Sequence, residues 1–344
     1  MNETLRDLAP FIWTHDQEIK HSNYGAMMHG GTHRRSDGDN RWYFLRRSFE
    51  VLEDFQEALL SLTVDGIYDL RVNGHFVGIG PARCSPRRKL VDSYDVSSFL
   101  KLGKNVIAVL CYVPGRDLGW YEGMRGSWQP VFGDGGFWGV LKVKVGDQQI
   151  TIKSDCDWKI IRANCWKQDT RPEGWGQGQT EVIDGSCYPF GWGNISFDDD
   201  HWPKAVEMRA IGNADDEAIG RGSIRPFPVL ARRGQPNLIS EMRSPERVFW
   251  SGKVQEVLSD QLPEYAYDLE PIGTSSKVEE CEPGWNLVSS AGEGAAISFV
   301  FDYHTGRPQI EIEAYGEEII DIAVSERLPG EPSNEDAGPL GRVG

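Results

Sequence analysis

The sequence is poor in several features that mark particular classes of protein. Positive charge is scarce, because 36 lysine and arginine residues stand against 52 aspartate and glutamate residues and leave a net charge of −16. Nucleic acids and anionic membranes bind basic surfaces, so neither is an expected partner. No stretch approaches the roughly 18 apolar residues of a membrane span, and residues 1–10 lack the apolar region of a secretory signal. We therefore expect a cytoplasmic protein.

Cysteine is also scarce. The 6 cysteines among 344 residues, at positions 84, 111, 156, 165, 187 and 281, include no C-x-x-C pair. This number and spacing favour a reduced protein in which the cysteines are ordinary buried residues. If the protein is exported, Cys156 with Cys165 is the expected disulfide.

Spacings typical of metal ligands are missing too. Asp198-Asp199-Asp200 offers the carboxylates that calcium prefers, but the run also fits an Asp-rich turn that Phe197 and Trp202 anchor, and we favour the turn. No H-E-x-x-H pattern occurs among the four histidines of the polar loop that ends at residue 40, His15, His21, His29 and His33. We expect a solvated loop, no metal and no other cofactor.

What the sequence does contain is alternation of apolar and polar residues, which is typical of β-strands. Residues 60–64 and 68–72 alternate in this way, and Asn73-Gly74 then predicts a two-residue hairpin, because a type I′ turn needs positive φ at both positions. Residues 106–113 are apolar on both faces, which predicts a strand at the centre of a sheet. Residues 11–13 predict an edge strand.

These patterns predict an all-β protein of two antiparallel, jelly-roll-like β-sandwich domains, and 344 residues suffice for two cores. We expect an N-terminal strand and polar loop over residues 1–40 and a first sandwich over 41–209. A polar, Gly-containing linker over 210–223 leads to a second sandwich over 224–328, which ends in a hairpin of residues 309–315 and 318–324. Residues 329–344, rich in proline and glycine, are expected to be a frayed tail.

Residues 114–138 show neither strand nor helix periodicity and are rich in glycine and aromatic residues. Aromatic rings can stack on the C–H face of a sugar while carboxylates and arginine bind its hydroxyl groups, and long loops on a rigid scaffold often carry binding sites. The alternative is that these rings plug the open end of the sandwich. The candidate carbohydrate-binding residues are Asp117, Trp120, Tyr121, Glu122, Arg125, Trp128 and Trp138.

Several segments resemble the N-terminal β-sandwich of bacterial α-L-rhamnosidases, which are multi-domain glycoside hydrolases. The segments include Tyr68-Asp69-Leu70-Arg71-Val72-Asn73-Gly74, Gly80-Pro81-Ala82 and Asp92-Ser93-Tyr94-Asp95-Val96, followed by Asp155-Cys156-Asp157-Trp158-Lys159 and Phe197-Asp198-Asp199 with Trp202. Their order and spacing agree over about 150 residues. One departure is Gly185-Ser186, where the family usually has Ala-Arg.

The resemblance implies that hydrolysis of terminal α-L-rhamnosides, with inversion, belongs to a C-terminal (α/α)₆ barrel that carries the acid and base. No helical array in this sequence predicts such a barrel, so we expect no catalytic residue and a missing C-terminal catalytic domain. The expected function is then the non-catalytic N-terminal part of such an enzyme, with a rhamnose-containing glycan as a candidate ligand. The alternative is a stand-alone, lectin-like carbohydrate-binding protein.

Overall fold

The fold is that of a computed structural model, which divides into two compact units, residues 1–237 and 238–344. The structure describes residues 5–14, 40–82, 84, 88–113, 135–170, 179–208, 229–237, 241–257, 268–273, 277–281, 284–288, 294–302, 310, 319–320 and 322. Within these ranges the chain forms β-strands and three short 3₁₀ helices, η1 (Leu5–Leu8), η2 (Ser97–Phe99) and η3 (Gly185–Cys187). None of the described helices is long and apolar enough to span a bilayer. The all-β prediction is confirmed.

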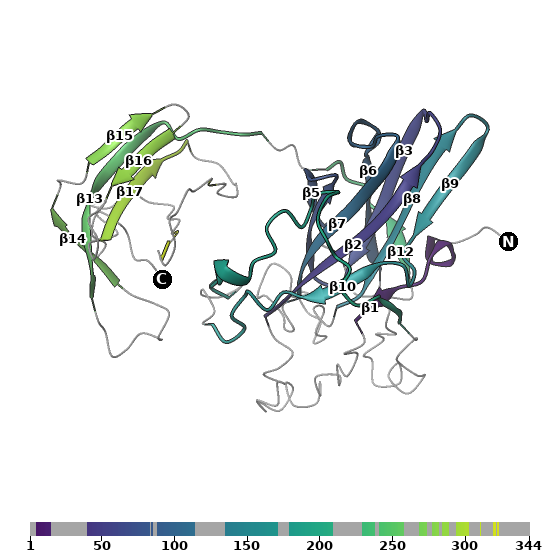
Figure 1. The fold of residues 1–344 in the computed structure, drawn as a ribbon, viewed down its shortest axis with the longest axis horizontal. Coiled ribbons are helices and arrows are strands. Elements are labelled where there is room, and N and C mark those ends of the chain that lie inside the picture. Colours follow the sequence, from purple (N-terminus) through teal and green to yellow (C-terminus); the bar gives the residue numbers. More distant parts are fainter. Residues whose placement is uncertain are drawn as a thin grey trace. The chain divides into compact units, whose positions relative to one another are not determined.

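The first unit is a sandwich of two sheets (Figure 1). The order β10-β2-β7-β4-β5 makes the five-stranded sheet, from β2 (Arg41–Val51), β4 (Ile67–Val72), β5 (His75–Gly80), β7 (Gly103–Val113) and β10 (Lys159–Arg162). The order β11-β1-β8-β3-β6-β12, with β9 on β8, makes the seven-stranded sheet, from β1 (Ile12–Trp13), β3 (Glu57–Val64), β6 (Lys89–Asp95), β8 (Phe137–Val145), β9 (Gln148–Lys153), β11 (Val206–Glu207) and β12 (Leu230–Arg232). All pairs are antiparallel except β6 with β12.

The predicted hairpin is present between β4 and β5. Asn73 and Gly74 have φ of 53° and 88°, as a type I′ turn requires. The Asn73 side chain donates to the Phe99 carbonyl at 2.8 Å and accepts from the Val106 N–H at 2.8 Å, so it ties the turn to the start of β7. The central position predicted for residues 106–113 is also confirmed, because β7 lies between β2 and β4.

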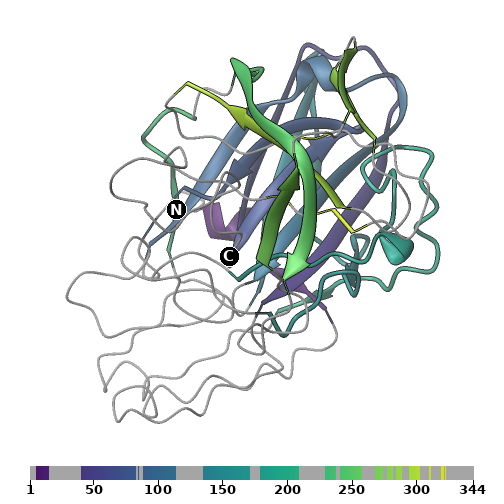
Figure 2. The same cartoon turned by 90° about the vertical axis from the view of Figure 1, so that its left-hand side faces the viewer.

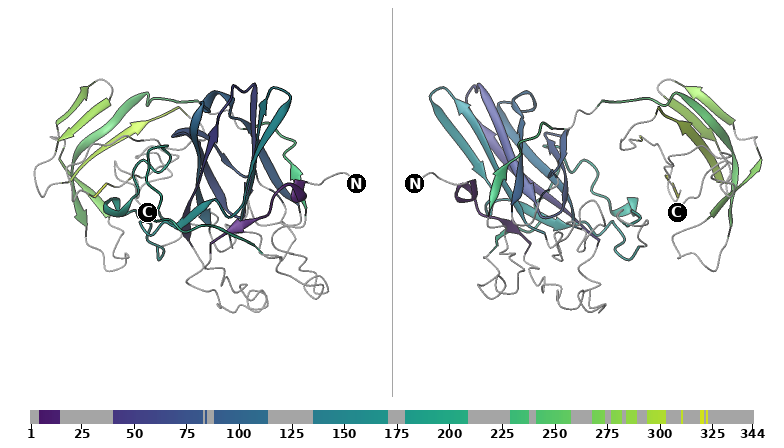
Figure 3. Two further views of the ribbon diagram at one scale, coloured as in Figure 1. Left: turned by 45° about the vertical axis from the view of Figure 1, so that its right-hand side comes forward. Right: turned by 180° about the vertical axis from the view of Figure 1, so that it is seen from behind.

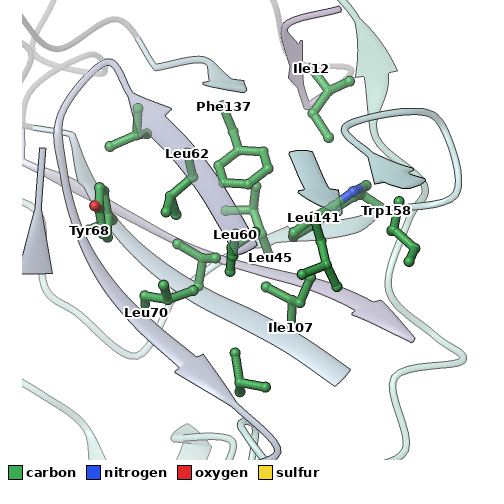
Figure 4. Packing of buried hydrophobic residues seen from close by; sticks show 14 of the residues in the cluster. Ile12, Leu45, Leu60, Leu62, Tyr68, Leu70, Ile107, Phe137, Leu141 and Trp158 are labelled. Carbon is green, nitrogen blue, oxygen red and sulfur yellow. The ribbon is translucent and has the colours of Figure 1, made fainter. Parts of the chain in front are cut away.

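The core of this unit lies between the two sheets, where alternation turns one side of each strand inward. Figure 4 shows Leu60, Leu62 and Leu141 of the seven-stranded sheet close to Leu45 and Leu70 of the other sheet, and all five are at most 1% exposed. Trp158 belongs to the same core, and its indole N–H donates to the Lys153 carbonyl at 3.0 Å.

The outer face of the five-stranded sheet is covered by the chain that follows β10, which lies outside the sheet in both panels of Figure 3. Phe44 of β2 packs there among Trp166, Trp192 and Trp202, at centroid distances of 5.0–5.9 Å. Arg46, two residues further along β2, donates to Asp199 at 2.7 Å and to the Trp192 carbonyl. An aromatic layer and a buried ion pair therefore hold this covering segment in place.

The Asp-rich segment forms the predicted turn. Asp198 accepts the N–H of Asp200 at 3.0 Å, and Asp199 is held by Lys159 at 2.8 Å as well as by Arg46. Phe197 and Trp202 pack on the aromatic layer. Two cations neutralise the central carboxylate, so this run is a structural turn.

The second unit contains a three-stranded sheet, β14-β13-β17, and a two-stranded sheet, β15-β16. Their bounds are β13 (Arg247–Val257), β14 (Asp268–Gly273), β15 (Lys277–Cys281), β16 (Gly284–Val288) and β17 (Gly294–Val300). The long strand β13 curves in Figures 1 and 2, and its register shifts at Val248/Trp250 and Lys253/Val254, as β-bulges do.

Three expectations need correction. Strand β1 is not the edge, because β11 pairs with it on the far side from β8. The boundary between the units falls after Asn237 instead of at 224, because β12 pairs with β6 of the first sandwich. The cysteines are not all buried, because Cys156 and Cys187 are exposed; Cys156 and Cys165 are both free, so the pair expected for an exported protein is not bonded here. The predicted linker, the polar loop up to residue 39, most of the hairpin at 309–324 and the tail lie outside the described residues.

Candidate functional site

The candidate site is one end of the first sandwich, here called the loop-bearing end. Strand β2 begins there at Arg41, opposite Val113 at the end of β7. Strand β3 ends there at Val64, opposite Phe137 at the start of β8. The chain between β7 and β8, which contains most of the predicted binding residues, therefore leaves and re-enters the sandwich at this end, near β1 in Figure 1.

Six of the seven predicted binding residues lie outside the described residues, namely Asp117, Trp120, Tyr121, Glu122, Arg125 and Trp128. The seventh, Trp138, is fully buried in a small cluster with Ala9 and Phe11, and its indole N–H donates to the Ala9 carbonyl at 3.0 Å. Both ring faces are covered, so Trp138 packs in the core and does not offer a stacking face to a sugar.

Polar residues are buried at this end to an unusual degree. The described residues include twelve buried polar or charged side chains, and eight of them lie at or near the loop-bearing end: Thr14, Asn40, Arg41, Thr63, Asp65, Lys89, Asp92 and Thr170. Burying such groups costs free energy unless they are paired, and only four of the twelve, Arg46, Ser61, Asn105 and Ser154, lie elsewhere in the sandwich. Concentrated buried polarity is typical of a binding site and also of a polar cap on a sandwich.

A hydrogen-bonded network organises part of this end. The Tyr68 hydroxyl donates to Asp92 at 2.7 Å and lies 3.1 Å from the Tyr94 hydroxyl. Arg233, which follows β12, donates to the other oxygen of Asp92 at 3.1 Å. Burial, reinforced by the negative charge of Asp92, raises the pKa of Tyr68 far above its usual range. Tyr68 therefore stays a neutral donor at every physiological pH.

Asn40 fixes the start of β2 at the same end. Its φ of 50° is a conformation that asparagine tolerates better than most residues. Its amide donates to the Gln168 carbonyl at 2.9 Å and to the Thr170 hydroxyl at 3.1 Å. This links the first residues of β2 to the segment beyond β10, across 130 positions of sequence.

Several buried donors at this end have no hydrogen-bond partner among the residues that the structure describes. They include the indole N–H groups of Trp13 and Trp42 and the hydroxyl groups of Thr14 and Thr63. Buried donors normally find a protein or water partner, so these positions are suited to a water molecule or a ligand hydroxyl group. Together with the Tyr68–Asp92–Arg233 network, these donors could form hydrogen bonds with the hydroxyl groups of a ligand.

Proton-transfer chemistry has less support in the described part of the chain. A general acid needs a carboxyl whose pKa is raised, whereas each described aspartate with a displaced pKa is shifted downward. Hydrogen bonds from Ser97 and Ser186 lower the pKa of Asp95 and Asp184. Burial would raise the pKa of Asp199, but Lys159 and Arg46 outweigh it. These carboxylates are suited to stay charged.

The buried polar residues of this end were not predicted as site residues. The sequence carries a partial signal for them, because Asp65 directly follows the largely apolar strand β3. Nothing local reveals that Arg233, 141 positions later, neutralises Asp92.

Comparisons with known proteins find similarity to α-L-rhamnosidases at the level of sequence and of structure. Residues 53–219 match the family model described as the alpha-L-rhamnosidase N-terminal domain. An alpha-L-rhamnosidase of Formosa agariphila is 29% identical over 181 residues, which cover 49% of this chain and 18% of that protein.

Two solved structures are similar as well. A GH78 family rhamnosidase of Bacillus sp. GL1 aligns with a TM-score of 0.54 and 26% identity, over 72% of this chain and 22% of that chain. An alpha-L-rhamnosidase of Aspergillus terreus aligns with a TM-score of 0.47 and 20% identity, over 75% of this chain and 25% of that chain. The chain thus spans about a fifth of the length of the first relatives that it matches.

Proposed function

From the premise that this chain carries the N-terminal domain of the α-L-rhamnosidase family, we propose that it is a non-catalytic N-terminal portion of an α-L-rhamnosidase-like glycoside hydrolase. The match of residues 53–219 to the family model carries this proposal. Hydrolysis of terminal α-L-rhamnosides, with inversion, is assigned to a catalytic part outside this chain. Inversion requires two carboxyl groups about 6.5–9.5 Å apart, one of them kept protonated as the acid.

Asp95, Asp184 and Asp199 have lowered pKa values, so these three groups are not suited to donate a proton. The test is an assay of the purified chain with p-nitrophenyl α-L-rhamnoside. We expect no hydrolysis above the rate of buffer alone. Robust turnover that scales with protein concentration would contradict the proposal.

We further propose that the loop-bearing end binds a neutral sugar, such as the rhamnose unit of a glycan. Support comes from the buried polar residues of this end and from the donors of Trp13, Thr14 and Thr63. The aromatic sequence between β7 and β8 adds rings that can stack on a sugar. Net negative charge makes a neutral ligand more suitable than an anionic one.

Intrinsic tryptophan fluorescence during titration with L-rhamnose tests this second part. We expect a saturable change in the millimolar range, and we expect Trp120→Ala to weaken or remove it. The control is Leu52→Ala, an exposed position just after β2 at the opposite end of the sandwich. A response that is absent, or identical in Trp120→Ala and Leu52→Ala, would remove the binding proposal and leave the family assignment untouched.

A further inference from the structure

A second feature of the first sandwich lies on the outer face of the five-stranded sheet, at its edge strand β5. Tyr68, Leu70 and Val72 of β4 point into the core, so Asp69 and Arg71 point outward. Residues that pair across strands lie on the same face. Asp69 pairs with Ile79 and Arg71 pairs with Phe76, so these four side chains lie together on the outer face.

The covering segment completes this surface, here called the edge patch, with Tyr188 and Phe190. The two rings lie 5.0 Å apart. Trp192 links Tyr188 to Arg71, because its indole N–H donates to the Tyr188 hydroxyl at 3.1 Å and its ring centroid lies 5.4 Å from the Arg71 guanidinium. The edge patch thus consists of Asp69, Arg71, Phe76, Ile79, Tyr188 and Phe190.

Three large apolar side chains of the edge patch are exposed to solvent. Phe190 is 75% exposed, Phe76 45% and Ile79 38%. Single exposed apolar residues are ordinary, but Ile79 and Phe76 lie opposite Asp69 and Arg71, the two members of an ion pair. Phe190 is connected to this pair through Tyr188 and Trp192. Aromatic rings beside arginine are typical of binding surfaces.

Arg71 is fixed in place by its own contacts. Its Nε donates to Asp69 at 3.2 Å, its guanidinium lies 5.4 Å from the centroid of the Trp192 ring, and its stem lies against Gly193. Its two Nη groups donate to no other described residue, and the side chain is 38% exposed. A guanidinium group that is held in place and has free N–H donors can donate to two adjacent oxygen atoms at once.

Tyr188 is also oriented. Its hydroxyl oxygen accepts the indole N–H of Trp192 at 3.1 Å, which leaves the hydroxyl hydrogen without an acceptor among the described residues. Three kinds of contact therefore meet at the edge patch: free N–H and O–H donors, the carboxylate of Asp69, and the exposed ring of Phe190.

We propose that the edge patch is a second saccharide-binding surface, separate from the loop-bearing end, which takes a neutral sugar ring with adjacent hydroxyl groups. The hydroxyl oxygens accept from the Nη groups of Arg71, and the C–H face of the sugar stacks on Phe190. Asp69 offsets the charge of Arg71, so the patch does not select an anion. Ile79 offers a contact for the methyl group of a 6-deoxy sugar, and this last preference rests on the proposed function.

The test is a titration of the whole chain with methyl α-L-rhamnoside, followed by saturation-transfer NMR. Phe190→Ala removes an exposed ring at little structural cost, and Leu52→Ala is the matched control. To separate the edge patch from the loop-bearing end, Phe190→Ala is also combined with Trp120→Ala in one variant. We expect binding to persist in Trp120→Ala, and the further change Phe190→Ala to weaken it by roughly fivefold to tenfold.

Arg71→Lys tests whether the two Nη groups of Arg71 donate to the sugar, since lysine keeps the positive charge and lacks the paired N–H donors of the guanidinium. We expect it to weaken binding as much as Phe190→Ala does, with an unchanged unfolding midpoint in urea as the check on folding. If Trp120→Ala alone abolishes binding, the edge patch is not a site and the proposed loop-bearing end stands. If no variant or native chain binds the sugar, both binding proposals fail and the family assignment remains.

Discussion

Arg46 shows how a single residue holds two layers of this protein together. Its side chain is 1% exposed, and its partners are Asp199 and the carbonyl groups of Trp192 and Asn194 in the covering segment. A buried charge of this kind is costly without its counterion, although replacing the whole pair with apolar residues is often harmless. The ion pair therefore positions the covering segment more than it adds net stability.

Asp199→Asn is expected to destabilise the first sandwich by about 2–3 kcal/mol, because Arg46 then lacks its counterion in a buried site. Asp200→Asn is the matched control: its side chain is 95% exposed, and the loss of its contact with Lys159 should cost less than about 0.5 kcal/mol. Urea unfolding followed by tryptophan fluorescence measures both. Equal effects from the two substitutions would show that the Arg46 pair has no special role.

The same pair predicts a dependence on pH. The pKa of Asp199 is lowered in the folded protein, so the ionised carboxylate is more stable in the folded protein than in the unfolded chain. Its stabilisation is complete above the ordinary aspartate pKa of about 3.9 and is lost as pH falls through the lower, folded value. The difference in unfolding free energy between the native chain and Asp199→Asn should be constant from about pH 5 to 7 and shrink below about pH 4. A difference that grows in acid would contradict this.

At the scale of elements, the hairpin between β4 and β5 was predictable because its signal is local. Asn73-Gly74 needs no information from elsewhere to adopt positive φ. The contact that the hairpin makes is not local: a Cβ built on Gly74 would lie 2.3 Å from the Asn194 side chain of the covering segment. Close approach of backbone to a neighbour is a second reason for glycine at this position.

Gly74→Ala should therefore cost more than Gly103→Ala, its matched control. Both residues have positive φ, 88° and 83°, so both substitutions carry backbone strain of about 1 kcal/mol. A Cβ on Gly103 meets nothing within 4 Å, whereas one on Gly74 collides with Asn194. We expect Gly74→Ala to be more destabilising by at least about 1 kcal/mol in urea unfolding. The variant Asn194→Ala should recover part of the difference.

The aromatic sequence between β7 and β8 illustrates the limit of prediction for the candidate site. Composition singled out Trp138 together with its neighbours, but Trp138 belongs to strand β8 and pairs opposite Thr63. Its ring faces a cluster formed by the N-terminal segment. A tryptophan that packs and one that binds look alike in sequence, because the difference lies in which distant segment covers the ring.

At the scale of the whole molecule, the division into two units depends on a parallel strand. β12 pairs with β6, and Arg233 behind it neutralises Asp92, which is fully buried. The predicted boundary at 224 placed this strand in the second domain, because a polar sequence precedes it. Residues 229–237 instead complete the first sandwich.

Two fragments test this boundary. Residues 1–237 retain β12 and Arg233, whereas residues 1–223 lose both and leave the carboxylate of Asp92 buried without its cation. We expect the shorter fragment to be less stable by about 3 kcal/mol or more in urea unfolding. Arg233→Ala in the longer fragment should reproduce much of this loss. Equal midpoints for the two fragments would place the boundary at 224 after all.

The sequence by itself determined the strands, the hairpin and the central place of β7, because alternation and turn residues act between near neighbours. Only the tertiary structure decided the boundary after Asn237, the burial of Trp138, the Arg46–Asp199 pair and the edge patch. These features join residues as far as 153 positions apart. Alternation along a strand predicts whether a side chain is buried or exposed. Which residue it contacts depends on how the covering segments pack on the sheets.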